Sequence, residues 1–171
     1  PRRRTSEAYW RAPLKWQAGA TAFQAQHGRR QRVFCASLAD VFDNQANAKW
    51  RTDLFALIAA TPSLDWLLLT KRPQNIKKML PEDWGNHGRH NVWLGTTAED
   101  QARFDQRWPI LGKIPASVRF ISYEPAIGAV RLHEGADQPD WLISGGESGH
   151  GARPMNPQWA RDIISDCNRL G

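Results

Sequence analysis

The chain has 171 residues, a length that favours one domain with a substantial core. Its hydrophobic fraction of 41% and charged fraction of 23% are ordinary for a globular protein and argue against intrinsic disorder. No apolar run approaches the roughly 20 residues of a membrane span, and no signal peptide is visible, so we expect a cytoplasmic protein without membrane contact. Two distant cysteines, Cys35 and Cys167, predict neither a disulfide framework nor a zinc site.

The net charge of +6 is concentrated at the start of the chain. Residues 1–32 hold eight Lys/Arg and one acid, whereas the remaining residues hold fifteen Lys/Arg and sixteen acids. Basic clusters of this kind contact phosphates, although a solvated arm is an equally good interpretation. We predict a basic N-terminal arm, residues 1–32, packed on a body formed by residues 33–171. The arginines of the arm that are candidates for nucleic-acid contact are Arg2, Arg3, Arg4, Arg29, Arg30 and Arg32.

The first 30 residues show no clear hydrophobic period. Residues 6–11 predict one or two helical turns ended by Pro13, and residues 14–16 predict another short piece that packs against the body. This opening is typical of a piece cut from a longer chain.

Five short apolar runs follow, and each ends in polar residues. They begin at Val33, Trp66, Val92, Val118 and Trp141, a spacing that leaves room for a helix between most of them. Helical spacing of apolar residues predicts these helices over residues 46–60, 74–80 and 101–111, and a last helix begins at residue 157. The pattern indicates an α/β fold with five parallel strands in one compact unit. A barrel and an open, doubly wound sheet both satisfy it.

In both architectures the functional groups collect at the carboxyl ends of the strands. The residues there mix carboxylates, cations and hydroxyls, which suits a polar, zwitterionic or phosphorylated ligand. For any single residue a structural role is the alternative, such as helix capping by Asp40 or Glu99. The candidate binding residues are Ser37, Asp40, Thr70, Lys71, Arg72, Thr97, Glu99, Asp100, Ser122, Glu124, Ser144, Gly145, Gly146, Glu147, Ser148 and Arg153.

The last apolar run leads into paired glycines and a lone carboxylate. Gly145 and Gly146 allow a sharp turn and the close approach of a ligand, and Glu147 then projects from the strand end. Charge complementarity makes Glu147 a candidate partner for an amino group, and Arg72 or Arg153 a partner for a carboxylate. A tight turn with a solvated glutamate is the alternative.

Familiar catalytic motifs are missing from the sequence. It contains no P-loop, nucleophile elbow, HExxH motif or dinucleotide fingerprint. His87 and His90 have the spacing of metal ligands on a helix, but the glycines beside them favour a loop. A metal-dependent hydrolase built on the strand-end carboxylates Asp40, Glu99, Glu124 and Glu147 therefore remains a weaker hypothesis.

Several motifs together resemble one family over nearly the whole chain. They are LTKRP at residues 69–73, NVWLGTTAEDQ at 91–101, RFISYEP at 119–125 and GGESG at 145–149, followed by ARPM at 152–155. With the segment at residues 32–42, they are similar to the phage-associated three-Cys-motif proteins, a radical-SAM-like family of phages and bacteria.

This resemblance implies a partial (β/α) barrel that holds S-adenosylmethionine beside a [4Fe-4S] cluster, with the strand-end residues as the cofactor pocket. The cluster cysteines of that family lie upstream of the arginine-rich stretch and are absent here. Cys35 and Cys167 match no part of their motif, so no cluster ligand is assigned. The chain is then expected to be the central portion of a longer protein, and a protein partner from a phage or bacterial operon fits this origin.

Two functional hypotheses follow. The first is the core of a radical-SAM-like enzyme with unknown reaction and substrate. The second is a nucleic-acid-binding module that uses the basic arm. The two coexist if the substrate is a nucleic acid.

Overall fold

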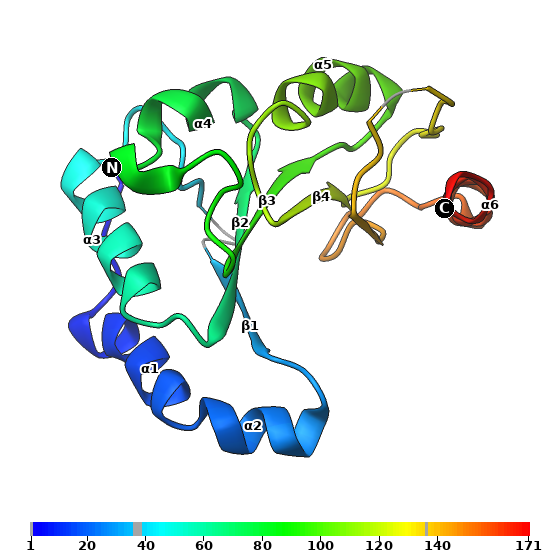
Figure 1. Cartoon of the computed structure of the whole chain (residues 1–171). Coiled ribbons are helices and arrows are strands. Elements are labelled where there is room, and N and C mark those ends of the chain that lie inside the picture. The colour runs from blue at the N-terminus through cyan, green and yellow to red at the C-terminus, as the bar shows by residue number, and fades with distance from the viewer. Residues whose placement is uncertain (1, 36–38, 136) are drawn as a thin grey trace.

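The computed structural model describes residues 2–35, 39–135 and 137–171. Within these residues five strands form one all-parallel sheet, in the order in which they occur along the chain. Doubly wound sheets reverse their strand order at a switch point. The sequential order therefore defines a barrel-type sheet, which is curled into a half-barrel (Figure 1). The strands are β1 Gln31–Cys35, β2 Leu64–Thr70, β3 Val92–Thr97, β4 Val118–Tyr123 and β5 Trp141–Ser144.

Helices connect the first four strands and follow the last one, as the sequence predicts. Figure 1 shows α3, α4 and α5 along one side of the sheet. The predicted polar loop after α4 contains a single turn of 3₁₀ helix, η1. The described residues between β4 and β5 contain no helix. The elements are α3 Ala48–Ala59, α4 Pro73–Met79, η1 Glu82–Trp84, α5 Gln101–Leu111 and α6 Pro157–Leu170.

Alternate side chains of the strands face the helices and form the main core. Trp66 and Leu68 of β2 and Tyr123 of β4 are buried there together with Ile58 of α3 and Trp108 of α5. Removal of this apolar surface from water is the main driving force for the helices to cover the sheet. Packing on this face fixes the strands and therefore the positions of their carboxyl ends.

The opposite face of the sheet carries an aromatic cluster. Phe120 is fully buried, and its ring lies so close to Gly95 that a Cβ atom there would be 2.2 Å from a ring carbon. Trp93 and Trp141 pack edge to face at 5.7 Å between ring centroids. The guanidinium of Arg32, near the start of β1, lies 4.7 Å from one tryptophan ring and 5.1 Å from the other. Arg32 therefore makes cation–π contacts with the sheet instead of projecting as part of a free arm.

The N-terminal segment is more helical than expected. Helix α1, Glu7–Ala18, continues through Pro13, and α2, Ala20–His27, follows it directly. The expectation that Pro13 ends a short helix is wrong. A proline inside a helix removes one hydrogen bond. Pro13 is buried, however, and the burial of its apolar ring helps to offset that loss.

Ion pairs tie this basic segment to the body. Nε of Arg2 lies 2.6 Å from Oδ2 of Asp43, and Nη1 of Arg4 lies 2.6 Å from Oδ2 of Asp53. Arg30 pairs with Asp65, also at 2.6 Å. Arg29 lies over the ring of Phe23, whereas Arg3 makes no ion pair with a described residue.

No helix in the described ranges is long and apolar enough to cross a membrane.

Candidate functional site

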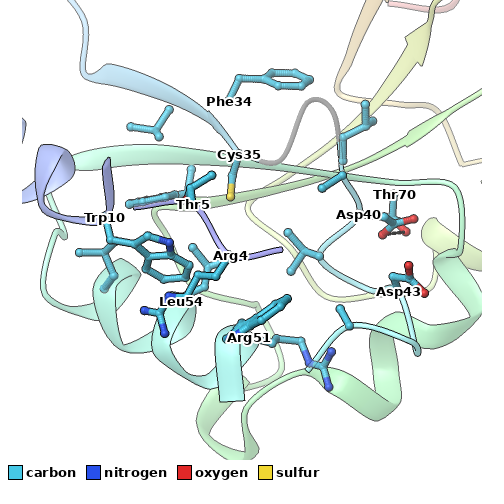
Figure 2. A pocket seen from close by; sticks show the side chains of 18 of the residues that line it. Arg4, Thr5, Trp10, Phe34, Cys35, Asp40, Asp43, Arg51, Leu54 and Thr70 are labelled. Atoms are coloured by element: carbon cyan, nitrogen blue, oxygen red, sulfur yellow. Dashed lines mark hydrogen bonds between the residues drawn. The ribbon is translucent and has the colours of Figure 1, made fainter. Parts of the chain in front are cut away.

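A cleft of about 1310 Å³ opens at the carboxyl ends of the strands. It runs from the ends of β2, β3 and β4 past β1 to the region between α1 and α3. Figure 2 shows part of its lining. The sequence-predicted residues that line this cleft are Asp40, Thr70, Lys71, Arg72, Thr97, Ser122 and Glu124.

Asp40 connects the end of β1 to the end of β2. Its Oδ1 accepts hydrogen bonds from the hydroxyl of Thr70 at 2.7 Å and from the backbone N–H of Phe42 at 2.9 Å. Its Oδ2 accepts from the backbone N–H of Lys71 at 3.1 Å and from Nη1 of Arg72 at 2.9 Å. Four donors satisfy this carboxylate, and Arg72 is already paired. The geometry gives both residues a structural role at the edge of the cleft.

Glu99, after β3, is held by two cations. Nζ of Lys71 lies 2.9 Å from Oε1, and Nη1 of Arg107 lies 2.8 Å from Oε2. Arg107 also donates to the carbonyl and the hydroxyl of Thr97, both at 2.9 Å. Burial would raise the pKa of Glu99, but the hydrogen bond from Lys71 and the charge of Arg107 outweigh it, so the pKa lies below its ordinary value. The cap of α5 is Asp100, which accepts from a backbone N–H at 2.8 Å.

Glu147 and Arg153 pair with each other in the loop after β5. Nε of Arg153 donates to Oε2 at 2.7 Å, Nη2 donates to Oε1 at 2.7 Å, and the backbone N–H donates to Oε2 at 2.9 Å. The side-chain hydrogen bonds from Arg153 are the main reason that the pKa of Glu147 falls to about 2. The two groups that the sequence assigns to an amino group and a carboxylate of a ligand thus neutralise each other, and neither lines the cleft.

Glu124 is the carboxylate of the cleft with spare hydrogen-bonding capacity. It is exposed, and the hydrogen bond it receives from described residues comes from the hydroxyl of Ser122 at 3.4 Å. A Cβ atom at position 145 would lie 2.4 Å from its Oε1, so the absence of a side chain at Gly145 makes room for this carboxylate. An ionised carboxylate can accept about four hydrogen bonds. Glu124 therefore offers acceptor sites to a ligand.

An exposed aromatic side chain also lines the cleft. Phe34 of β1 is 42% exposed, unusually open for a phenylalanine in a strand. Its ring centroid lies 6.4 Å from that of Phe120, so it extends the aromatic cluster toward the strand ends. The sequence identifies Phe34 as a strand residue only, because nothing in the apolar run distinguishes an exposed ring from a buried one.

The remaining predicted residues that the structure describes lie outside the cleft lining. Gly146 faces Met155, and a Cβ atom there would be 3.3 Å from the nearest side-chain atom. Ser144 and Ser148 are exposed near the end of β5. Ser37 lies outside the described residues.

The described residues offer no evident metal site. They contain no group of three or more His, Cys, Asp or Glu side chains placed to hold a metal ion. His87 and His90 lie in a loop, as the glycines predict. Cys35 lies on β1 and Cys167 on α6, and burial raises the pKa of the Cys35 thiol to about 12. This disfavours the thiolate form that metals bind.

The cleft also has a part that the sequence does not predict. Arg51 and Trp50 of α3 and Trp10 of α1 line it beyond β1. These residues line the cleft because of how α1 packs against the body, and no local sequence motif predicts that packing.

A curled, all-parallel half-barrel with a cleft at its strand ends defines the class of protein: an α/β protein of the half-barrel type. The chain belongs to the family described as "Protein of unknown function (DUF5131)", whose model matches residues 1–171. The comparisons with curated proteins and with solved structures found no match.

Proposed function

We propose that the chain binds S-adenosylmethionine in the cleft at the carboxyl end of the sheet and forms the ligand-binding core of a radical-SAM-like enzyme. The observation that carries the proposal is the carboxylate of Glu124, which lies against Gly145 with one long hydrogen bond from the described residues. A carboxylate in a cleft is a suitable partner for a ligand amino group. The motifs RFISYEP and GGESG, which contain Glu124 and Gly145, also belong to the resemblance that suggests this ligand.

The other parts of S-adenosylmethionine also find complementary groups. The exposed ring of Phe34 offers a surface on which a purine can stack. The ammonium group of Lys71 has three donors, and Glu99 accepts one of them among the described residues. Its remaining donors can serve the carboxylate of the ligand. Glu124, Lys71 and Phe34 thus match an amino group, a carboxylate and an aromatic base.

The residues of this chain do not fit an iron–sulfur cluster. Such clusters are usually held by four cysteine thiolates. The sequence has two cysteines, and Cys35 is held in its neutral form by burial. The proposal for this chain is therefore confined to ligand binding, and no reaction step is assigned to a cluster.

The alternative functions have weaker support. A nucleic-acid-binding arm would rely on arginines of which Arg2, Arg4 and Arg30 already pair with carboxylates. A metal-dependent hydrolase would rely on Asp40 and Glu99, which fixed cations already satisfy.

Isothermal titration calorimetry with two ligands tests the proposal. 5′-Methylthioadenosine shares the adenosine and the sulfur of S-adenosylmethionine but lacks the amino-acid part. We expect S-adenosylmethionine to bind at least roughly tenfold more tightly, because a hydrogen bond to a charged group contributes on the order of 1.5–3 kcal/mol. Equal affinities would contradict the role of Glu124. If neither ligand binds, the proposed function is refuted.

A further inference from the structure

The cleft has a second lobe on the other side of β1. Figure 2 shows that successive residues of this strand point in opposite directions: Phe34 points away, whereas the thiol of Cys35 faces Trp10 and Leu54. This lobe lies between α1, β1 and α3, and Trp50 also lines it. Its walls are thus largely aromatic and apolar.

Two arginines of the lobe already have anionic partners. Arg4 pairs with Asp53 at 2.6 Å, and its guanidinium lies 4.1 Å from the ring centroid of Trp10. Arg2 pairs with Asp43 through its Nη2 atom as well as its Nε, and Nη2 lies 2.5 Å from Oδ2. The positive charge of both groups is therefore satisfied within the protein.

Arg51 differs from these two arginines. It lines the cleft from α3, but its side chain makes no hydrogen bond or ion pair with any described residue. Its Nη1 atom is buried from solvent and has no acceptor among the residues that the structure describes. A buried N–H without an acceptor destabilises the folded state, and more so in a charged group. Such groups are rare in folded proteins and call for a specific explanation.

We propose that this lobe binds an organic phosphate of the mononucleotide class, with its phosphate on Arg51 and its planar ring against the tryptophans. The guanidinium fork matches a phosphate, and a small rotation of the flexible arginine side chain would supply the missing acceptor. Trp10 and Trp50 provide aromatic surface for a base. This inference goes beyond the proposed function, because Arg51 and these tryptophans are not the groups assigned to S-adenosylmethionine.

Calorimetry with three probes separates the parts of the ligand. We expect uridine 5′-monophosphate to bind, and uridine and inorganic phosphate each to bind at least roughly tenfold more weakly, since each lacks one of the two recognised groups. Inorganic phosphate that binds as tightly as the nucleotide would indicate an adventitious ion only and would overturn the proposal. So would the absence of nucleotide binding.

Arg51→Met combines a binding test with a stability test. It should weaken nucleotide binding by roughly tenfold or more, while the melting temperature stays the same or rises, because an unsatisfied buried polar group is removed. Arg11→Met is the matched control, since Arg11 is an exposed residue of α1 outside the cleft lining. A lower melting temperature with unchanged affinity would show that Arg51 is merely structural and would overturn the proposal.

The proposals for the two ligand sites can be tested separately. Glu124→Gln should leave the affinity for uridine 5′-monophosphate unchanged, because Glu124 follows β4, whereas the second lobe lies between α1, β1 and α3. If S-adenosylmethionine does not bind but the Arg51-dependent nucleotide binding is observed, the proposed function fails and this inference stands. If nucleotide affinity falls in Glu124→Gln as much as in Arg51→Met, the second lobe is not a separate site and the inference fails.

Discussion

Two neighbouring strands of the sheet end in glutamates with opposite environments. Glu147, after β5, receives three hydrogen bonds from Arg153 at 2.7–2.9 Å. Glu124, after β4, receives one at 3.4 Å from described residues and lines the cleft. The residue type and the position in the fold are the same, yet one carboxylate is neutralised by its own loop and the other is available to a ligand.

This difference separates structural charges from binding charges at the strand ends. Asp40 and Glu99 resemble Glu147, because fixed cations satisfy them and stabilise the connections around the cleft. Glu124 stands apart among these four carboxylates. A parallel sheet gathers polar groups at one edge, and the pairing of each group then decides whether it supports the fold or binds a ligand.

The largest effect on this comparison is expected from Gly145→Ala. The new methyl group would lie 2.4 Å from Oε1 of Glu124 and would force that carboxylate to move. We expect only a small loss of stability, because Oε1 is the far end of an exposed, flexible side chain that can turn away, but clearly weaker S-adenosylmethionine binding, because the carboxylate is displaced. Urea denaturation and calorimetry measure the two effects.

Gly146→Ala is the matched control for this substitution. A Cβ atom at position 146 meets its nearest side-chain atom at 3.3 Å, a contact that a small shift of Met155 relieves. It should therefore change the affinity for S-adenosylmethionine much less, because it leaves the carboxylate of Glu124 in place. Equal effects of the two substitutions would show that the space beside Glu124 is not special.

A smaller effect is expected when Glu147 loses its ion pair with Arg153. In Arg153→Ala the pKa of Glu147 should rise from about 2 to its ordinary value near 4.3. A carboxylate with a lowered pKa stabilises the folded state above the unfolded-state pKa, and that stabilisation is lost as the pH falls from about 4 to about 2. The free energy of unfolding of the variant should therefore lack the part that the unaltered chain loses between about pH 4 and about pH 2.

An NMR titration of the Glu147 side-chain carboxyl carbon gives the midpoint directly. The melting temperature near neutral pH should change little, because exposed ion pairs contribute little to stability. A midpoint that stays near 2 without Arg153 would show that another group lowers the pKa of Glu147.

The sequence predicts the sheet well because each strand is a short apolar run with polar residues after it. The order of the strands is harder to predict from the sequence, because the apolar runs alone fit both a barrel and a doubly wound sheet. The observed order β1-β2-β3-β4-β5 decides between them. The continuation of α1 through Pro13 could not be foreseen, because it depends on the burial of that proline in the folded chain.

The candidate site is predicted as a set but not in its internal pairing. Thr70, Lys71, Thr97 and Glu124 do meet at one cleft, since parallel strands align their carboxyl ends. The sequence favours Glu147 over Glu124 because glycines precede it. Only the folded loop shows that Arg153 turns back to pair with Glu147, and that Gly145 makes room for Glu124 instead.

The most direct test of the central claim compares the S-adenosylmethionine affinity of Glu124→Gln and Glu147→Gln, measured by calorimetry alongside the unaltered chain. Both substitutions remove one negative charge at a strand end and keep the side-chain shape. The account predicts a loss of roughly tenfold or more for Glu124→Gln and nearly unchanged affinity for Glu147→Gln. A large loss for Glu147→Gln with an unaffected Glu124→Gln would contradict it.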